Sequence, residues 1–403
     1  MTRRTFVTST LAASAAAATP LPAARPKKIA AIMNVLWEKR ASHARSIIGK
    51  CLFGYNYDSK PPGPGFEIAS MFTHQTPESD ISRDWSRKTG VPVFPTIYEA
   101  LTLGGKDLAV DGVLLIGEHG DYEWNEKGQH LYPRFELFLE ITDAFRVTSK
   151  SVPVFNDKHL SWSWIKAKRM YDISKELKFP FMAGSSIPVM YREPEVEVPL
   201  GAPVRHCVAL GWGNRDSYGF HLLETIQCFI DRRKGGETGV KAVQAFDGDD
   251  VWKFLDENGW ARHLFEAALA RSKTRIPGRV RDLVNDPGVF VTEHRDGVKT
   301  ATFIIPGAFR DFNFAVDIEG QREPLASMIW SSDEKRPHFT CMLQGIEKMF
   351  NTGRPTYPVE RTLLVSGILH FAMESRFQQC KRLETPELDV RYEIKGDSFH
   401  CRA

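Results

Sequence analysis

Short apolar runs alternate with longer amphipathic stretches through the first half of the chain. The run 113–116, Val-Leu-Leu-Ile, is unbroken and lies between two glycines. Such a run is typical of a central parallel strand that helices cover on both faces. The alternation continues from the first run to residue 183, so we expect a doubly wound parallel sheet. The pattern predicts strands over 28–33, 66–72, 91–94, 113–116, 152–155 and 181–183, and helices over 40–52, 78–89, 96–103, 132–146 and 164–177.

The pattern changes after Gly184, where several strands follow one another through short turns such as Asp296-Gly297. Successive strands joined by tight turns favour antiparallel pairing. We therefore expect an α+β domain over 185–403 with one large, mostly antiparallel open sheet, and its last helices, 339–379, packing back. The predicted strands are 205–210, 240–246, 289–294, 299–305, 311–318 and 325–331, and the predicted helices are 216–231, 249–271, 339–351 and 359–379.

Composition narrows the class of protein. A chain of 403 residues is long for one core, which favours two domains, 25–184 and 185–403. The formal net charge of +3 gives no reason to expect nucleic acid or an anionic membrane surface as a partner. After the amino terminus no run is long and apolar enough to span a bilayer. The six cysteines contain no Cys-x-x-Cys pair, so a zinc ribbon is not expected.

The first 24 residues have the character of an export signal. Arg3-Arg4 is followed by a run of small residues, 11–18, and by Pro-Ala-Ala at 22–24. This order is typical of a twin-arginine signal peptide, which directs an already folded protein out of the bacterial cytoplasm. We therefore expect residues 1–24 to be removed and the mature protein to be periplasmic or secreted.

Polar residues follow two of the predicted parallel strands. The strand 113–116 runs into Gly117, Glu118 and His119, and the strand 152–155 runs into Asp157 and Lys158. In open α/β sheets ligands bind just beyond the carboxyl ends of the strands. These side chains are therefore candidates for one shared site.

A second candidate group lies on the predicted helix 216–231. His221 and Glu224 are three residues apart, so they share a face of this helix. Histidine and carboxylate ligands suit zinc, manganese or iron. If this helix meets the strand ends, a divalent metal is an alternative to an organic cofactor, with His119, Asp121, His221 and Glu224 as its ligands.

The order of these motifs resembles the Gfo/Idh/MocA family, named for glucose–fructose oxidoreductase and inositol dehydrogenase. The similarity runs over essentially the whole mature chain. Asn156-Asp157-Lys158-His159 lies where that family has its Glu-Lys-Pro motif. Gly219-Phe-His221-Leu-Leu-Glu224 lies at its Gly-x-His-x-x-Asp motif, and Phe350-Asn-Thr-Gly-Arg-Pro resembles the segment before its closing helices.

The resemblance implies a Rossmann-like NAD(P)-binding domain followed by a domain that binds a small sugar or polyol. It further implies that Lys158 polarises the reacting hydroxyl or carbonyl and that His221 is the acid/base, a reasonable pair for hydride transfer at a carbinol. A homo-oligomer formed through the large sheet is one arrangement we consider. The residues placed to bind the cofactor would be Asn34, Trp37, His74, Gly117, Glu118, His119 and Asp157.

Three departures from the family pattern matter, and the first two concern the cofactor. Residues 33–40 read Met-Asn-Val-Leu-Trp-Glu-Lys-Arg, without the glycines that let a backbone approach a pyrophosphate. The second strand ends in Thr73-His74-Gln75, without the acidic residue that binds ribose hydroxyls. The proline of the lysine motif is His159. These residues predict an atypical or lost NAD(P) site.

Three functional hypotheses remain open from the sequence. The first is an exported oxidoreductase fold acting on a sugar or polyol, which either holds a dinucleotide in an unusual, non-exchanging way or has given up redox chemistry. The second is a metal-dependent, non-redox lyase or hydrolase acting on a carbohydrate. The third is a carbohydrate-binding protein without catalytic activity.

Overall fold

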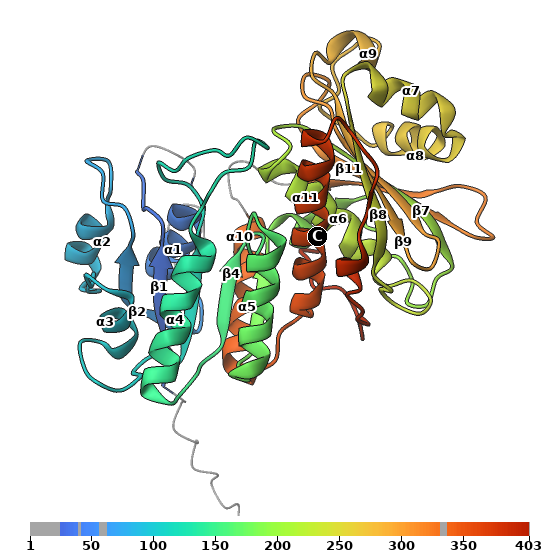
Figure 1. Cartoon of the computed structure of the whole chain (residues 1–403). Coiled ribbons are helices and arrows are strands. Elements are labelled where there is room, and N and C mark those ends of the chain that lie inside the picture. Colours follow the sequence, from blue (N-terminus) through green and yellow to red (C-terminus); the bar gives the residue numbers. More distant parts are fainter. Residues whose placement is uncertain (1–24, 39–41, 56–62, 331–336, 403) are drawn as a thin grey trace, which may run out of the picture.

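A computed structural model describes residues 25–38, 42–55, 63–330 and 337–402. Two sheets lie next to each other, with one long helix, α11 (Val359–Phe377), between them (Figure 1). The first sheet has five strands in the order β2-β1-β3-β4-β5, and the second has eight in the order β13-β8-β9-β10-β7-β11-β12-β6. This arrangement confirms the predicted fold class. The twin-arginine segment lies outside the described residues.

The first sheet is parallel at every pair of its described strands. Its central strand β3 is buried at all five residues, as expected from the unbroken apolar run. The strand order reverses between β1 and β3, so their carboxyl ends border the position where such sheets bind ligands. The strands are β1 (Lys27–Met33), β2 (Phe66–Thr73), β3 (Gly112–Ile116), β4 (Val154–Asp157) and β5 (Phe181–Gly184).

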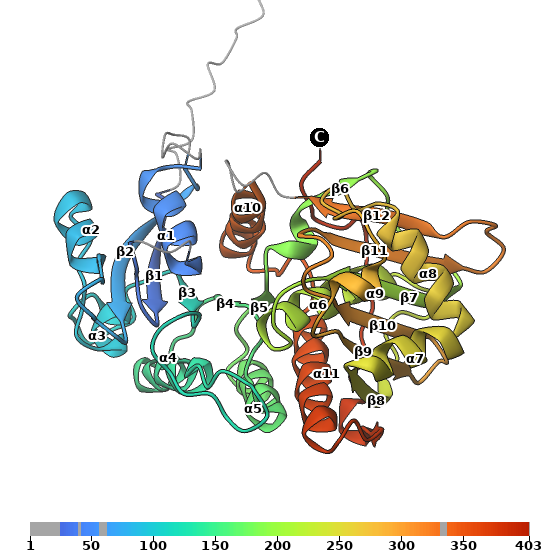
Figure 2. The ribbon, with the colours of Figure 1, turned by 90° about the horizontal axis from the view of Figure 1, so that it is seen from above.

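Helices cover both faces of the first sheet, as Figure 2 shows from above. One face packs against α1 (His43–Phe53) and α10 (Pro337–Thr352), and α2 (Ser82–Thr89) lies beside α1. The other face packs against α3 (Ile97–Thr102), α4 (Arg134–Thr148) and α5 (Trp164–Glu176). Helix α10 therefore returns from the C-terminal part of the chain to complete the core of the first sheet.

The second sheet is mostly antiparallel, and among its described strands only β10 and β7 pair in parallel. Its strands are β6 (Tyr191–Glu193), β7 (Val204–Gly211), β8 (Val240–Asp247), β9 (Gly288–His294), β10 (Lys299–Ile304), β11 (Phe312–Ile318), β12 (Leu325–Trp330) and β13 (Leu383–Glu384). The short strands β6 and β13 and the 3₁₀ turns Ile187–Val189 and Pro386–Leu388 are additions to the predicted elements.

Helices also cover both faces of the second sheet. α6 (Ser217–Ile230) and α11 pack on one face. The other face carries α7 (Asp249–Glu257), α8 (Gly259–Leu269) and α9 (Val280–Leu283), whose apolar residues form a separate core with that face. Pairing of two copies through this sheet stays a prediction, and it would have to use the area that α7, α8 and α9 leave uncovered.

Three predicted elements differ from the structure. The strand expected over 91–94 makes only a single bridge, between Met71 and Val93. The helix expected over 249–271 is two helices that break at Asn258, where φ is −113° and ψ is 88°, just before Gly259. The helix expected from residue 78 begins at Ser82, because Asp80 instead accepts a hydrogen bond from the backbone N–H of Leu36.

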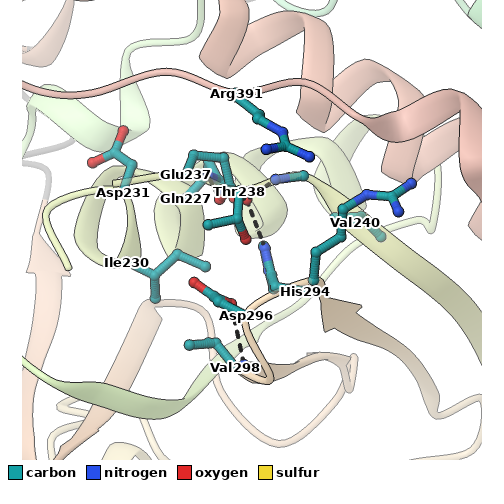
Figure 3. A network of polar contacts seen from close by, with 12 residues as sticks. Gln227, Ile230, Asp231, Glu237, Thr238, Val240, His294, Asp296, Val298 and Arg391 are labelled. Carbon is teal, nitrogen blue, oxygen red and sulfur yellow. Dashed lines mark hydrogen bonds and ion pairs between the residues drawn. The ribbon is translucent and has the colours of Figure 1, made fainter. Parts of the chain in front are cut away.

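A buried polar network lies within the second domain (Figure 3). Glu237 accepts hydrogen bonds from Arg233 at 3.0 and 3.1 Å, and its carboxylate lies 3.0 Å from Nδ1 of His294. Gln227 donates a further bond, at 2.5 Å. Burial alone would raise the pKa of Glu237, but the His294 and Arg233 groups hold it well below its usual value. The network is satisfied within the protein, so we assign it a structural role.

Candidate functional site

A cavity of about 650 Å³ lies between the first helix of the Rossmann-like domain and the second sheet. His43 at the start of α1 and His221 on α6 both line it, and their rings are 6.4 Å apart. The wall is largely aromatic. It includes Trp212, Tyr218, Phe312, Trp330 and Phe339. A concave, mostly apolar site with a few convergent polar groups is the usual form of a small-molecule site.

His221 is held by a short chain of hydrogen bonds. Its Nδ1 lies 2.9 Å from the hydroxyl oxygen of Ser185, and that hydroxyl donates to Glu224 at 2.5 Å. The Ser185 oxygen is therefore left to accept from Nδ1–H, so the lone pair of His221 is on Nε2. Burial, followed by the positive charges of Lys158 and His43, keeps the pKa of His221 well below its ordinary value. At neutral pH this imidazole is an uncharged base.

Glu224 should make stability depend on pH. Burial raises its pKa from 4.5 to about 7, against the hydrogen bonds from Ser185. The native state therefore holds this proton more tightly than the unfolded state does. Its contribution is fully present below pH 4.5 and is lost as pH rises through about 7, by about 3 kcal/mol in total. In urea unfolding, the free energy of unfolding of Glu224→Gln should rise relative to that of the wild type between pH 5 and pH 8.

The matched control is Glu266→Gln, on the exposed surface of α8. Its unfolding free energy should stay parallel to that of the wild type across the same pH range. Parallel profiles for Glu224→Gln as well would contradict the assignment of a raised pKa to this carboxyl group.

His43 forms a second side-chain pair at the cavity. Its Nδ1 lies 2.7 Å from Oδ2 of Asp157, which is fully buried at the end of β4. A carboxylate bound to Nδ1 orients the imidazole and fixes its other nitrogen as the reactive one. The His43 ring also lies 5.8 Å from that of His119. The ring of His43 thus lies near those of two histidines from other segments, His221, which lines the cavity, and His119, which does not.

A cluster of buried charges lies beneath these histidines. Glu118 pairs with the guanidinium of Arg134 and lies 3.4 Å from the ammonium of Lys158. Arg134, which is fully buried, also contacts Nε2 of His159 at 3.2 Å. Burial alone would raise the pKa of Glu118, but Lys158 and then Arg134 keep it well below its usual value. Lys158 is 3% exposed and is not among the residues that line the cavity.

The backbone is strained at two candidate residues. His119 has φ of 67° and Lys158 has φ of 70°, a region that side-chain-bearing residues rarely occupy. Such strain costs on the order of 1–3 kcal/mol and persists where surrounding contacts enforce it. Lys158 is fixed by its N–H, which donates to the carbonyl of Gly184 at 2.9 Å, and by the Asn156 amide, which donates to its carbonyl at 3.3 Å.

The loops after β1, β2 and β3 are tied to one another. Asn34 donates from its side chain to the carbonyl of His119 at 3.0 Å. Gln75 exchanges two hydrogen bonds of 2.8 Å with the backbone of Asp121. His74 lies 2.8 Å from the hydroxyl of Tyr122. Residues predicted to bind a dinucleotide are thus used to hold the 117–122 segment over the ends of β1 and β2.

The connection between β1 and α1 also departs from a pyrophosphate site. Val35 and Leu36 are fully buried, and Leu36 is bonded through its backbone to Asp80 and Ile81. Helix α1 begins only at His43, with Ser42 as its N-cap. A pyrophosphate needs close backbone approach and a free helix N-terminus directly after the strand. The described residues, 34–38 and 42–43, do not fit the ordinary binding of NAD(P).

Other predicted cofactor residues are likewise engaged. A side chain at Gly117 would collide with Arg134, and the Glu118 carboxylate is neutralised by Arg134 and Lys158. The Trp37 ring lies 6.1 Å from the His119 ring. His119 has an unpartnered Nδ1, and burial lowers its pKa to about 4. The roles assigned to these residues from the sequence stay predictions.

The metal-site prediction has no support among the described residues. No group of three or more His, Cys, Asp or Glu side chains within the described ranges is placed to hold a metal ion. Asp121 is exposed at the loop tied to Gln75, and Glu224 is bonded to Ser185 on the inner side of His221. His119 and His221 therefore do not share a carboxylate ligand as the hypothesis required.

Three residues of the site were not selected from the sequence. His43 is not selected from the sequence because the helix is expected to begin at residue 40. The signal that could identify it is a histidine directly after the helix N-cap Ser42. Arg134 reads as an ordinary charged residue of an amphipathic helix. Ser185 follows the predicted strand 181–183, and the sequence assigns it no role.

Comparisons with solved structures show the same two-domain fold. GenD2 from gentamicin A biosynthesis in complex with NAD has a TM-score of 0.58 and 12% identity, over 91% of this chain and 99% of that one. Myo-inositol 2-dehydrogenase from Lactobacillus plantarum has a TM-score of 0.54 and 11% identity, over 89% of this chain and 99% of that one. Scyllo-inositol dehydrogenase from Lactobacillus casei, in its apo form, has a TM-score of 0.54 and 11% identity, over 89% and 98%.

No family model matches the sequence, and no curated protein matches it. The structural matches confirm the Gfo/Idh/MocA-type resemblance at the level of the fold. Across the described ranges, none of the helices combines the length and apolar character needed to cross a membrane.

Proposed function

We propose that this protein is a carbohydrate-active enzyme that acts on a sugar or polyol by acid–base chemistry. The observation that carries the proposal is the meeting of His43 and His221 at one wall of the 650 Å³ cavity. Each imidazole has its Nδ1 engaged by a buried partner, Asp157 or Ser185. Such an arrangement leaves the Nε2 atoms as the proton-transfer groups.

The walls of the cavity support a sugar or polyol as the ligand. Trp212, Tyr218 and Phe312 present aromatic surface, and the Trp212 and Tyr218 rings lie 4.6 Å apart. Aromatic side chains combine a large apolar contact area with a polar edge, which suits the apolar faces and hydroxyl rim of a carbohydrate. The inositol dehydrogenases among the structural matches are named for polyol substrates, which supports the same class.

In this proposal the neutral imidazole of His221 removes a proton from the substrate, and His43 delivers one to the substrate on its own side of the cavity, so that the protons balance. Lys158 does not touch the substrate. Burial lowers the pKa of His221, and the charge of Lys158 lowers it further and counterbalances Glu118. We therefore assign Lys158 a positioning role, instead of the polarising role that the family resemblance implied.

We further propose that the ordinary NAD(P) site has been lost. The support is the engagement of Asn34, His74 and Gln75 with the 117–122 segment, together with the buried Val35 and Leu36. An enzyme without this site carries out a redox-neutral reaction. This is the part of the first hypothesis in which the protein has given up redox chemistry. No step is assigned to a dinucleotide.

An oxidoreductase that holds a dinucleotide in an atypical way is the second candidate. It is favoured by the fold shared with GenD2 and the inositol dehydrogenases. One experiment separates the two candidates. If the site has been lost, protein that is purified under native conditions and then denatured should release no nucleotide with the ultraviolet absorbance of adenine. Release of one NAD(P) per chain would instead establish the oxidoreductase and refute the loss of the site.

Export by the twin-arginine route remains part of the proposal. Fractionation of the producing cells should place the protein outside the cytoplasm, with a mature amino terminus near residue 25. Retention of the intact chain in the cytoplasm would refute export without affecting the proposed chemistry.

A further inference from the structure

The charged groups around the cavity are unevenly distributed. Among the described residues that line it, the side chains able to carry a positive charge outnumber the carboxylates. Those with a permanent charge are Lys273 and Arg310, against Asp311 as the only carboxylate among the described lining residues. The lining histidines are not counted, because His221 is uncharged at neutral pH. A cavity lined by one sign of charge raises the local concentration of ligands of the opposite sign.

The single carboxylate is already occupied. Oδ2 of Asp311 accepts hydrogen bonds from the Ser272 hydroxyl at 3.0 Å and from the backbone N–H groups of Lys273 and Thr274 at 2.9 and 3.1 Å. Its Oδ1 accepts from Asn313 at 2.6 Å. Asp311 is also 8% exposed. It therefore organises the loop at the cavity rim and does not serve as an open acceptor for the hydroxyls of a neutral sugar.

Arg310 stands next to Asp311 in the chain, and its side chain is uncommitted. Its backbone N–H donates to the Thr274 hydroxyl at 2.8 Å, and the residue is exposed at the cavity. Its guanidinium has no hydrogen-bond or ion-pair partner among the described residues. Lys273, by contrast, is paired with Glu193. The guanidinium of Arg310 thus lies at the cavity rim without a hydrogen-bond or ion-pair partner among the described residues.

A further donor without an acceptor lines the same cavity. The indole Nε1 of Trp212 is buried and has no hydrogen-bond partner in the described part of the chain. An indole N–H can only donate, as can a guanidinium. The Trp212 indole and the Arg310 guanidinium are therefore both donors without a partner among the described residues, and the exposed Arg310 group is the one that a ligand with acceptor oxygens can reach.

We infer that the substrate is a sugar that carries an anionic group, a carboxylate or a phosphate, bound by Arg310 at the rim while the sugar ring lies against the aromatic wall. The planar guanidinium matches both groups with two parallel hydrogen bonds, which a lysine ammonium does not reproduce. This inference rests on the proposed function and adds its substrate class.

The test is calorimetric titration of the full mature protein with matched ligands: D-glucuronate, D-glucose 6-phosphate and D-glucose, and the corresponding galactose set. At least one anionic member should bind about 10-fold or more tightly than its neutral counterpart, and raising the salt concentration should weaken that preference. The carboxylate and phosphate arms identify which anion is used. Arg310→Gln should bring the anionic and neutral sugars to equal affinity.

The control is Arg322→Gln, at an arginine whose side chain is 96% exposed and which does not line the cavity. It should retain the full preference. Equal binding of anionic and neutral sugars by the wild type, or an undiminished preference in Arg310→Gln, would overturn the inference and leave the proposed function standing. Failure of every sugar in both sets to bind would count against the inference and the proposed function together.

Discussion

Replacing His221 with asparagine should lower turnover of the sugar substrate by about 10²–10⁴-fold, the range expected when a general acid–base group is removed. Asparagine can still donate to the Ser185 hydroxyl that Nδ1 of His221 contacts at 2.9 Å, so the fold and the Ser185–Glu224 bond should persist. It has no nitrogen that can accept a proton in place of Nε2. Steady-state kinetics should show the loss in kcat, with little change in KM.

His263→Asn is the matched control, because His263 is exposed on α8 and does not line the cavity. Its turnover should equal that of the wild type. His43→Asn should also lose activity, since it removes the group held by Asp157 at 2.7 Å. Full activity in His221→Asn would exclude this histidine from the chemistry.

Replacing Arg134 with methionine should lower the free energy of unfolding by about 3–5 kcal/mol, the usual cost of breaking a buried ion pair by removing one partner. Arg134 is fully buried, pairs with Glu118 and contacts His159 at 3.2 Å. Its loss leaves the buried Glu118 carboxylate with Lys158, at 3.4 Å, as its remaining cation. Equilibrium urea unfolding measures the change.

The free energy of unfolding of Arg134→Lys should lie between those of the wild type and the methionine variant, because lysine keeps the charge but not the planar guanidinium. The control is Arg87→Met, which removes an exposed ion pair with Asp84 on α2 and should cost less than about 1 kcal/mol. A similar small cost for Arg134→Met would mean that the Glu118 cluster does not stabilise the fold as described.

The fold was largely predictable because its signals are local. The unbroken apolar run of β3 and the turn at Asp296-Gly297 each specify an element without reference to distant residues. The errors arose where tertiary contacts override local preference. Asp80 bonds to Leu36 and delays α2, and the chain at Asn258 divides one expected helix into two.

The site was predictable only in part, because its partners come from distant parts of the chain. The sequence placed Glu118, Asp157 and Lys158 at strand ends, and they do lie together. No spacing rule brings His43 to Asp157 across 114 positions, or Arg134 into a fully buried pair. The missing glycines predicted an altered cofactor site, but only the structure shows Asn34, His74 and Gln75 bonded to the 119–122 segment.

The most direct test of the account is turnover by protein shown to be free of nucleotide, assayed on the sugar that it binds. We predict that the sugar is converted with no dinucleotide added, and that millimolar NAD⁺ or NADP⁺ leaves the rate unchanged. Conversion that depends strictly on an added dinucleotide would contradict the account.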